Sequence, residues 1–555
     1  MPDLTYLVYT YFLLASIPVW YLLISYSRTR HLPNGPTPLP IIGNKLDLAK
    51  YCCPKKPWLQ FEDWARLYGP IYTIWIGRSP TIIVSDPNIA VDLLEKRSTK
   101  YSSRPRMVAM GELLWEGSSM LVQPYGKEWS MRRKLLHQAL TPKALRLYKP
   151  VQEAEASRLC FQLLGHAHQF ERMFERFTAS VVFCVAYGHR IDSLDARVIR
   201  ERFEFMRYSA SLNVPGKYMV ETFPVLKYVP DFLAPWKKEI KRNGKKEAAA
   251  NMALVNIVRN DIVLANMVGA PGSLPDSLCK LLLETRQKQH IPLSERDFSF
   301  IPASLFGAGS DTTASTLCTA ILAFVTHPTA LRAAQEEIDT VVGLDRTPTF
   351  ADESELPYIC ALVKEVLRWR PVAVLGGTPH ASTEDDRYGK FFIPRGTTIL
   401  VNSWAVNLNP EYYPDPHRFE PSRFLPDGGA AAGLSKPAKE HPSKTGHSSF
   451  GWGRRICPGA DLAVNTLFVA LAKLIWGFNI RAIEGREYDT FAYTDGFNIR
   501  PQRFDCAISV RSEEKREVLH RENQAAQEYL KKFTPCGENT DDMMLFEIRL
   551  IARRR

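Results

Sequence analysis

Apolar residues along this chain recur with a helical period over most of its length. Residues 58–68 are predicted to form a helix, and from residue 87 onwards positions three and four apart are repeatedly apolar. Residues 294–326 form the longest predicted helix, roughly 50 Å if continuous. Two short runs, 71–76 and 81–85, have the composition of strands. The pattern therefore predicts a mainly α fold with a small β subdomain.

The N-terminal stretch is largely apolar along its whole length. Residues 4–26 carry no charge, and as a helix they would span about 34 Å, enough for a hydrocarbon core of about 30 Å. Arg28 and Arg30 follow at once, whereas Asp3 is the only charged side chain before it. A cleaved signal peptide fits less well, because the basic start is missing and the run is too long. We expect residues 1–31 to be a single-pass anchor, with the remainder in the cytosol.

The rest of the chain divides into a hinge, a body and a tail. Residues 32–57 begin with four prolines in eight residues, so a stiff extended hinge is expected. Residues 58–512 contain no obvious linker or repeat. The tail, 513–555, has no assigned role: a packed extension, a partner-binding segment and a gene-prediction artefact all remain open. In the tail, a set of residues could line one helix face: Val518, Glu522, Ala525, Tyr529 and Phe533.

Charge and cysteine content narrow the class of protein. The chain has 71 basic and 59 acidic residues, a net charge of +12. These charges are dispersed and no nucleic-acid motif accompanies them, so we expect no nucleic acid, but an anionic membrane and an acidic partner. The ten cysteines are scattered without Cys-x-x-Cys pairs, which favours reduced thiols facing the cytosol.

One cysteine lies in a distinctive loop. Residues 450–459 read Phe-Gly-Trp-Gly-Arg-Arg-Ile-Cys-Pro-Gly. Gly451, Gly453 and Gly459 would let the backbone turn and bring N–H groups towards the sulfur of Cys457, which stabilises a thiolate. A buried structural cysteine is the plainer interpretation. The loop fits the pattern Phe-x-x-Gly-x-Arg-x-Cys-x-Gly, which has five fixed positions. From average residue usage, these five positions match by chance in roughly 1 of 10,000 chains of this length, which favours a functional site.

This pattern resembles the heme-thiolate signature of the cytochrome P-450 family. The resemblance implies the cytochrome P-450 fold, preceded here by one transmembrane helix, and heme b as cofactor with Cys457 as its axial thiolate ligand. A thiolate donates electron density to the iron and favours O–O cleavage. Arg455 would lie against a heme propionate, and Phe450 would shield the cysteine side of the heme.

The middle of the longest predicted helix contains Ala-Gly-Ser-Asp-Thr-Thr at 308–313. A glycine inside a helix costs about 1 kcal/mol relative to alanine, so Gly307 and Gly309 require a reason. A flat macrocycle against the helix, with a local bulge for dioxygen, would supply one. Asp311 and Thr312 resemble the family's catalytic acid–alcohol pair, which delivers protons during oxygen activation.

Further motifs follow in the order of the family. Glu365 and Arg368 lie one helical turn apart, and Arg423 belongs to Pro-Ser-Arg-Phe, a near match to Pro-Glu-Arg-Phe in which Ser422 replaces the usual Glu. By resemblance, Glu365, Arg368 and Arg423 form a buried structural triad that fixes geometry.

Three more residues are implied as heme contacts. Trp129 and Arg133 resemble the family's Trp-x-x-x-Arg and would face a propionate from one helix. His380 occupies a position that often supplies another propionate contact, although a structural histidine is an equal alternative. Arginines suit this task because buried propionates without cations would be costly.

The overall resemblance is to fungal microsomal members acting in secondary metabolism, including the O-methylsterigmatocystin oxidoreductase-like group. It implies a monooxygenase of the endoplasmic reticulum membrane with a cytosolic catalytic domain at residues 58–512. The substrate would be a lipophilic metabolite (polyketide, terpenoid or alkaloid), with Phe306 in the pocket wall. Electrons would come from an NADPH-dependent flavoprotein reductase, with cytochrome b5 as a second donor, because the chain has no Gly-rich dinucleotide domain of its own.

Two other functions keep the heme. A heme-thiolate isomerase or dehydratase would rearrange a peroxide, but such members tend to lose the acid–alcohol pair, which Asp311 and Thr312 retain. A non-enzymatic heme sensor would need an exchangeable second ligand and an output domain, and neither is evident. Residues 223–236, apolar and broken by prolines, are either a packed loop or a segment that dips into the membrane.

Overall fold

The computed structural model describes residues 16, 20, 31–51, 56–212, 217–270, 272–496 and 498–536. The predicted anchor at 4–26 lies outside the described residues except for Ser16 and Trp20, both helical. Residues 52–55 of the predicted hinge and 537–555 of the predicted tail also lie outside them.

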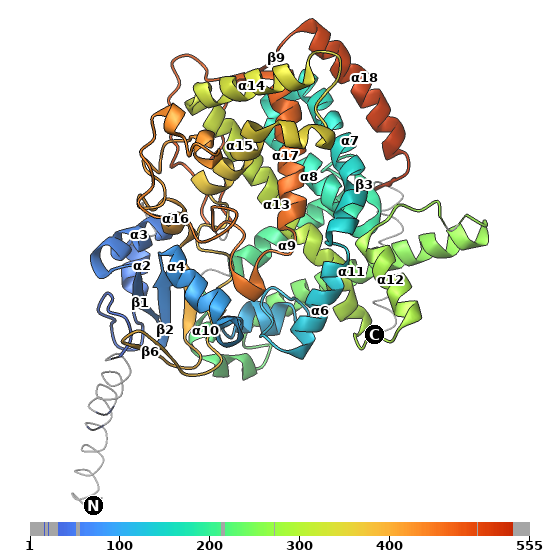
Figure 1. The fold of residues 1–555 in the computed structure, drawn as a ribbon. Helices are drawn as coiled ribbons and strands as arrows, with labels where there is room; N and C mark the ends of the chain where they lie inside the picture. Colours follow the sequence, from blue (N-terminus) through green and yellow to red (C-terminus); the bar gives the residue numbers. More distant parts are fainter. Residues whose placement is uncertain are drawn as a thin grey trace, which may run out of the picture.

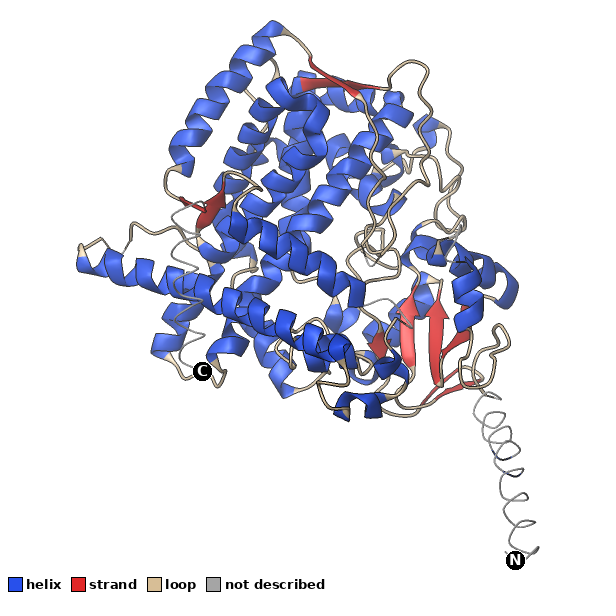
Figure 2. Cartoon of the chain, turned by 180° about the vertical axis from the view of Figure 1, so that it is seen from behind, coloured by secondary structure: helices blue, strands red, loops and turns tan. Residues whose placement is uncertain are grey.

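Helices make up most of the fold, as predicted, and a small sheet lies at one corner (Figure 1). Figure 2 shows the same division from behind, with the sheet to one side of the helical body. The longer helices are α3 (Pro57–Tyr68), α6 (Lys127–Gln138), α7 (Pro142–His166), α8 (Phe170–Tyr187), α9 (Arg197–Leu212), α11 (Pro235–Met267), α12 (Leu278–Lys288), α13 (Glu295–Thr326), α14 (Pro328–Val342), α15 (Pro357–Trp369), α17 (Ala460–Gly477) and α18 (Glu513–Leu530).

Helix α13 runs through the centre of the body. The Ser294 side chain caps it by accepting from the Asp297 N–H, and it ends just before Pro328. Residues 313–325 are all buried, as expected of a helix that is apolar on every side. The prediction that this is the longest helix is wrong by one residue: α13 has 32 residues and α11 has 33.

The main sheet has four strands in the order β1-β2-β7-β4. Both predicted strands are present and pair as an antiparallel hairpin, although β2 begins two residues earlier and ends one residue earlier than expected. Pro80 is tolerated there because it lies at the end of the hairpin, opposite Trp75. The strands of this sheet are β1 (Ile71–Ile76), β2 (Ser79–Val84), β7 (Thr398–Val401) and β4 (His380–Ala381).

Three two-stranded pairs complete the strands of the described residues. Two are antiparallel, β5 with β6 and β8 with β9, and the pair β3 and β10 is parallel. Their bounds are β3 (His189–Ile191), β5 (Asp386–Tyr388), β6 (Phe391–Ile393), β8 (Phe478–Arg481), β9 (Ala507–Val510) and β10 (Thr534–Cys536).

The described part of the tail is folded onto the body. Helix α18 lies along α7 (Figure 1), and the Arg190 guanidinium donates to the Leu530 carbonyl (2.7 Å). The predicted buried face is wrong by one position, since Ala525 is exposed while Ala526 is buried. The side of the helix that packs on α7 decides which residues are covered, and the buried residues are Lys515, Val518, Leu519, Asn523, Ala526 and Leu530.

Among the described residues, the two helices α11 and α17 are long and apolar enough to cross a membrane. The number rises to three if the bent pair α13–α14 is counted as one span. Both are largely packed within the fold: 56% of the apolar window of α11 and 72% of that of α17 is buried. Their apolar surfaces therefore serve the protein core. Only the C-terminal end of α11 projects beyond the body (Figure 2), where Leu264 and Met267 are exposed.

Candidate active site

The loop around Cys457 folds back on itself just before α17. The Cys457 N–H donates to the Phe450 carbonyl (2.8 Å). Gly451 and Gly453 have φ of +75° and +58°, in the left-handed region. A Cβ on Gly453 would lie 1.9 Å from the Leu94 carbonyl oxygen, so this position also needs glycine for space. The loop is thereby held against the helical segment Val91–Lys96, which contains Leu94.

Gly459 serves a different purpose from the other two glycines. Its φ is −96°, which any residue adopts, so the expectation that it provides a tight turn is wrong. Its N–H instead interacts with the Cys457 sulfur and opposes the rise in the thiol pKa that burial causes. Arg133 acts in the same direction, and its guanidinium donates to the Ile456 carbonyl (2.5 Å). An N–H and a cation thus favour the thiolate form of Cys457.

Arg455 is anchored beside this loop by backbone carbonyls. Its Nε donates to Ser102 O (2.7 Å) and its Nη2 to Gln123 O (2.7 Å). Its guanidinium lies 4.1 Å from the ring centroid of Trp129, so both predicted heme contacts meet in space. Burial, together with the charges of the nearby Arg104 and Arg133, lowers the pKa of Arg455 to about 8.

Arg104 is a third cation at this site, and no motif in the sequence pointed to it. Its Nε donates to Leu121 O (3.1 Å) and its Nη1 to Pro379 O (3.0 Å). Burial lowers its pKa to about 9. Arg104 lies within Ser-Ser-Arg-Pro at 102–105, and this context was the available signal, because an arginine next to a proline can be fixed by the backbone carbonyls of a turn.

Arg104, Arg133 and Arg455 form a partly buried cation cluster without an acid: none of the three has an ion pair with a carboxylate of the described residues. Buried cations are costly unless an anion accompanies them. The two propionates of heme b are anions of the right kind to compensate this charge. The residues around Cys457 therefore fit heme b, with a sulfur for the iron and arginines for the propionates.

His380 lies buried in β4, next to this cluster. Its Nδ1 is 2.8 Å from the Tyr101 carbonyl, so Nδ1 carries the proton and Nε2 of the neutral ring is an acceptor. Burial and the charge of Arg104 lower the His380 pKa to about 3. His380 would donate to a propionate only when protonated, a form that the propionate charge itself would favour. Its contact with Tyr101 is structural.

Phe450 is half-buried at the start of the same loop. Its ring centroid lies 5.7 Å from that of His447, and it packs against the main hydrophobic core. The ring is thus fixed in place on the cysteine loop, as the predicted shielding role requires.

The acid–alcohol pair forms a second group, in the middle of α13. The Thr312 hydroxyl donates to the Ala308 carbonyl (2.7 Å). Burial raises the pKa of Asp311, and the charge of Arg500 opposes this rise. The Arg500 guanidinium lies 3.4 Å from the Asp311 carboxylate and 2.5 Å from that of Glu175. Arg500 and Glu175 carried no motif in the sequence, because only the fold brings them to Asp311.

The two helix glycines have different surroundings. A Cβ on Gly309 would lie 2.6 Å from Val182 Cγ1 on α8, so Gly309 permits two helices to pack closely. This corrects the expectation that it faces the macrocycle. Gly307 and Ala308 are exposed, whereas 313–325 are buried, so this part of α13 borders open space. Helix α13 is α-helical throughout 295–326, and the predicted bulge is not present.

Glu365, Arg368 and Arg423 meet in the core. Arg368 binds the Glu365 carboxylate through Nε and Nη2 (2.6 and 2.8 Å), and Arg423 Nε donates to it at 3.2 Å. The Arg368 Nη1 also donates to Asn407 O and Pro416 O. The substituted Ser422 binds Glu420 through its hydroxyl (2.8 Å). The geometry is that of a largely buried charge network, which ties α15 to the segment before the cysteine loop.

Comparisons with known proteins agree with this geometry. A family model for cytochrome P450 matches residues 33–507. Cytochrome P450 monooxygenase 58 of Postia placenta is 36% identical over 487 residues, covering 86% of this chain and 89% of that protein. Cytochrome P450 monooxygenase verL of Clonostachys rogersoniana is 34% identical over 510 residues, covering 90% and 91%. A zebrafish cytochrome P450 solved with abiraterone has a TM-score of 0.63 at 25% identity, covering 82% of this chain and all of that one.

Proposed function

Because this chain belongs to the cytochrome P450 family and is a heme-dependent monooxygenase, we propose that it oxidises a lipophilic secondary metabolite at the endoplasmic reticulum membrane. The cofactor is heme with a cysteine thiolate as axial ligand, and Cys457 is the residue that we assign to this role. When bound, the heme activates dioxygen so that one oxygen atom enters a C–H or C=C bond of the substrate.

The observation that carries the proposal is the cation cluster beside Cys457. Three arginines are held by backbone carbonyls, and no carboxylate within the described part of the chain neutralises them. This arrangement is costly for the protein alone and is relieved by a dianionic cofactor. Arg455 and Arg104 would hold one side of the heme. Arg133 would stabilise the sulfur of Cys457 while its guanidinium donates to the Ile456 carbonyl.

Asp311 and Thr312 would direct protons to the oxygen-binding side. Thr312 holds its hydroxyl hydrogen on the Ala308 carbonyl, which leaves the hydroxyl oxygen able to accept from a water or an acid. Asp311 is half-buried with Arg500 beside it, so it can exchange a proton with solvent through a small movement of its side chain. A positioned acid of this kind contributes general acid catalysis.

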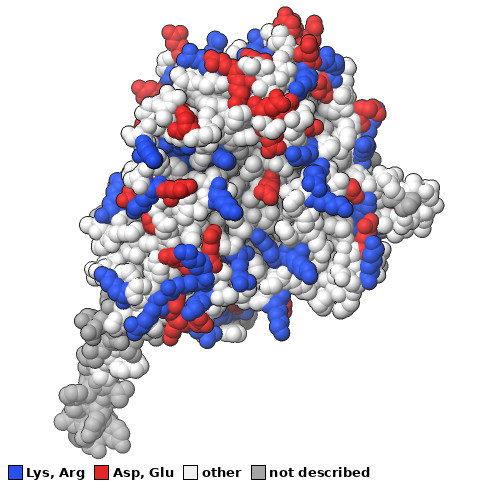
Figure 3. Space-filling view, viewed as in Figure 1, with Lys and Arg blue, Asp and Glu red and all other residues white. Residues whose placement is uncertain are grey.

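Electrons would come from an NADPH-dependent flavoprotein reductase, with cytochrome b5 as a second donor. Lys and Arg side chains spread over the lower middle of the face in Figure 3. Exposed basic residues on α6 and the start of α7 include Lys127, Lys134, Lys143 and Arg146. A basic surface attracts an acidic partner and accelerates its association.

The membrane assignment rests on two apolar surfaces. The uncharged run at 4–26 is long enough to span a bilayer. In the described fold, Val225, Tyr228, Phe232 and Leu233 are exposed in the segment between α9 and α11. Apolar side chains gathered on one loop are unfavourable in water and suit a lipid surface.

The test is turnover in microsomes that contain this protein and its reductase. With NADPH and a panel of lipophilic fungal metabolites, we expect an oxygenated product that incorporates label from ¹⁸O₂. The Cys457→Ser variant should lose both the product and the thiolate-type spectrum of the reduced carbon monoxide complex, because a neutral hydroxyl donates far less charge to iron. A product that forms without NADPH and without label would instead favour peroxide rearrangement.

A further inference from the structure

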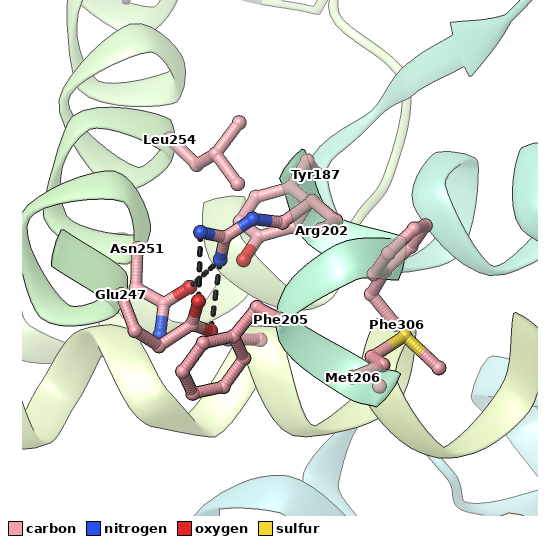
Figure 4. A pocket seen from close by; sticks show the side chains of 10 residues that line it. Tyr187, Arg202, Phe205, Met206, Glu247, Asn251, Leu254 and Phe306 are labelled. Atoms are coloured by element: carbon pink, nitrogen blue, oxygen red, sulfur yellow. Dashed lines mark hydrogen bonds and ion pairs between the residues drawn. The ribbon is translucent and has the colours of Figure 1, made fainter. Parts of the chain in front are cut away.

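Buried arginines in the described part of this protein are paired with carboxylates, with one exception. The buried arginines are Arg132, Arg158, Arg176, Arg202, Arg368 and Arg370. All but the last form an ion pair with an Asp or Glu. Figure 4 shows one of these pairs, Arg202 with Glu247 (2.7 Å), in the lining of a small pocket. Arg370 forms no ion pair with a carboxylate of the described residues, although a buried cation without one is costly.

Aromatic rings and the oxygens of one distant residue hold Arg370 instead. It is 1% exposed and lies directly after α15. Its guanidinium carbon lies 4.2 Å from the ring centroid of Trp369 and 4.8 Å from that of Phe491, close enough for cation–π attraction. Its Nε donates to Thr490 O (2.9 Å) and its Nη2 to Thr490 Oγ1 (3.3 Å). The planar guanidinium therefore fixes Thr490 at two points.

Thr490 begins the first of two paired chain arms, residues 490–494 and 499–502. Backbone hydrogen bonds join the arms, including one from the Thr494 N–H to the Arg500 carbonyl (2.8 Å). The Arg500 N–H in turn donates to Thr494 Oγ1 (3.1 Å). Because the arms are bonded to each other in both directions, a displacement of the first arm is passed on to Arg500.

The two arms contact α13 at two levels. The Tyr493 hydroxyl lies 3.2 Å from Thr319 Oγ1, and Arg500 Nη2 lies 3.4 Å from the Asp311 carboxylate. The Tyr493 contact comes between the level of Thr490 and that of Arg500, so it can act as a pivot. The usual N–H···O distance is about 2.7 to 3.2 Å, so the contact of Arg500 with Asp311 is long. A small rotation of the arms is enough to change it.

Few charged or titratable groups face Asp311. Arg500 comes from the second arm and Glu175 from α8, while Cys318 lies two turns further along α13 itself. The charge of Arg500 and a hydrogen bond from Asn498 oppose the rise in the Asp311 pKa that burial and Glu175 cause. The separation of Arg500 from Asp311 therefore influences how readily this acid takes up a proton.

We propose that Arg370 is a positioning residue for the acid Asp311: by fixing Thr490, it keeps Arg500 at its place beside the acid. This inference rests on the proposed function, in which Asp311 delivers protons during oxygen activation. The buried cation thereby has a purpose beyond packing, since it sets the electrostatic surroundings of an acid that it does not touch.

The test follows the protonation of Asp311 itself, so that it requires no substrate and no turnover. The heme-loaded full-length protein in detergent is titrated with acid and monitored by infrared difference spectroscopy. The C=O stretching band of a protonated carboxyl that is missing in Asp311→Asn is assigned to Asp311. In Arg370→Met the arms lose their hold at Thr490, so the midpoint of this band should move to higher pH, by no more than in Arg500→Gln.

A double variant shows whether Arg370 acts through Arg500. In Arg370→Met/Arg500→Gln the midpoint should equal that of Arg500→Gln alone, because the group that Arg370 positions is already absent. The matched control is Arg190→Met. Arg190 also fixes a distant segment through a backbone carbonyl, that of Leu530 (2.7 Å), but it contacts neither arm, so its midpoint should equal that of wild type.

The proposal is overturned if Arg370→Met titrates like wild type, if the double variant moves beyond Arg500→Gln, or if Arg190→Met produces the same shift. Should Arg370→Met lose the reduced carbon monoxide spectrum, Arg370→Lys decides. It keeps the charge but lacks the two-point hold on Thr490, so its midpoint should also rise, and an unchanged midpoint overturns the proposal. Failure of the proposed function would appear differently, as a wild type without NADPH-dependent product whose infrared titrations still show the shift.

Discussion

The Arg500 guanidinium lies 3.4 Å from the carboxylate of Asp311, a residue 189 positions earlier in the chain. Arg500 shares its charge between this acid and Glu175. The Arg500 charge therefore lowers the Asp311 pKa less than an unshared cation would, while burial raises this pKa. The pair couples the middle of α13 to a segment near the C-terminal end of the catalytic body.

Replacing Arg500 should change the pH dependence of coupling between NADPH and product. In Arg500→Gln the charge that lowers the Asp311 pKa is lost, so this pKa should rise further. The protonated fraction of Asp311, which is the form that can act as a general acid, falls as the pH rises through its pKa, and the alkaline limb of product formed per NADPH should therefore shift to higher pH. Arg503→Gln, at an exposed position, is the control. Superimposable profiles for Arg500→Gln and wild type would remove Arg500 from proton delivery.

Thr312→Ala should separate electron consumption from oxygenation. Without the hydroxyl, protons are poorly directed, so more of the reducing equivalents should appear as hydrogen peroxide. Product per NADPH should fall by roughly a factor of 10 or more, as for a lost general acid. Thr316→Ala is a closely matched control, because its hydroxyl makes the same bond one turn further along, to the Thr312 carbonyl (2.9 Å). Equal yields in the two variants would exclude a special role for Thr312.

Arg455→Gln should weaken retention of heme. The variant loses the charge that we assign to a propionate, and a hydrogen bond to a charged group contributes about 1.5 to 3 kcal/mol. Heme transfer to an excess of apomyoglobin should therefore become about 10- to 100-fold faster. The neighbouring Arg454 is exposed and binds Tyr125 and Ser98 at the surface, so Arg454→Gln should behave like wild type. Matching rates for both variants would contradict the assignment.

Glu365→Gln should destabilise the fold itself. It leaves Arg368 and Arg423 buried without their shared carboxylate, and breaking such a network costs about 3 to 5 kcal/mol of the free energy of unfolding. Urea titration followed by tryptophan fluorescence measures this loss. Glu355→Gln, on an exposed turn nearby, should change stability by less than about 0.5 kcal/mol. A small effect at Glu365 would mean that the network is not the structural tie described above.

Deleting residues 1–28 should release much of the protein from membranes and leave heme incorporation intact, because the anchor contributes insertion and not the pocket. Fractionation after a high-salt wash measures the released share. Should the truncated chain remain wholly bound, the exposed side chains around Phe232 and Leu233 would be the main attachment, and replacing both with Ser in the truncated chain should then release it.

The sequence predicted those parts of the molecule that depend on local pattern. The glycine-punctuated loop around Cys457, the pairing of Glu365 with Arg368 one turn apart, and the central helix all follow from spacing along a few residues. The family resemblance supplied the order of these motifs. Within the described residues, the helical body and the corner sheet agree with the mainly α prediction.

Features that depend on long-range packing were missed. Gly309 was assigned to the heme because nothing local reveals that Val182 on α8 lies 2.6 Å from its missing Cβ. Arg500 could not be connected to Asp311, since any of the chain's many arginines could pair with that acid. The buried face of α18 was misplaced by one residue because the period of a helix fixes spacing, whereas the neighbour α7 decides which side is covered.

The parallel pairing of β10 with β3 has a consequence for the order in which the chain is made. Thr534 pairs with His189, so a ribosome must add more than three hundred residues after β3 before its partner strand exists. Until then the edge of β3 presents unpaired backbone groups, which are a template for association with other chains. Nascent chains of this protein should therefore depend on chaperones until late in translation, and a stop codon placed before residue 534 should lower the soluble yield more than it lowers the activity of the molecules that do fold.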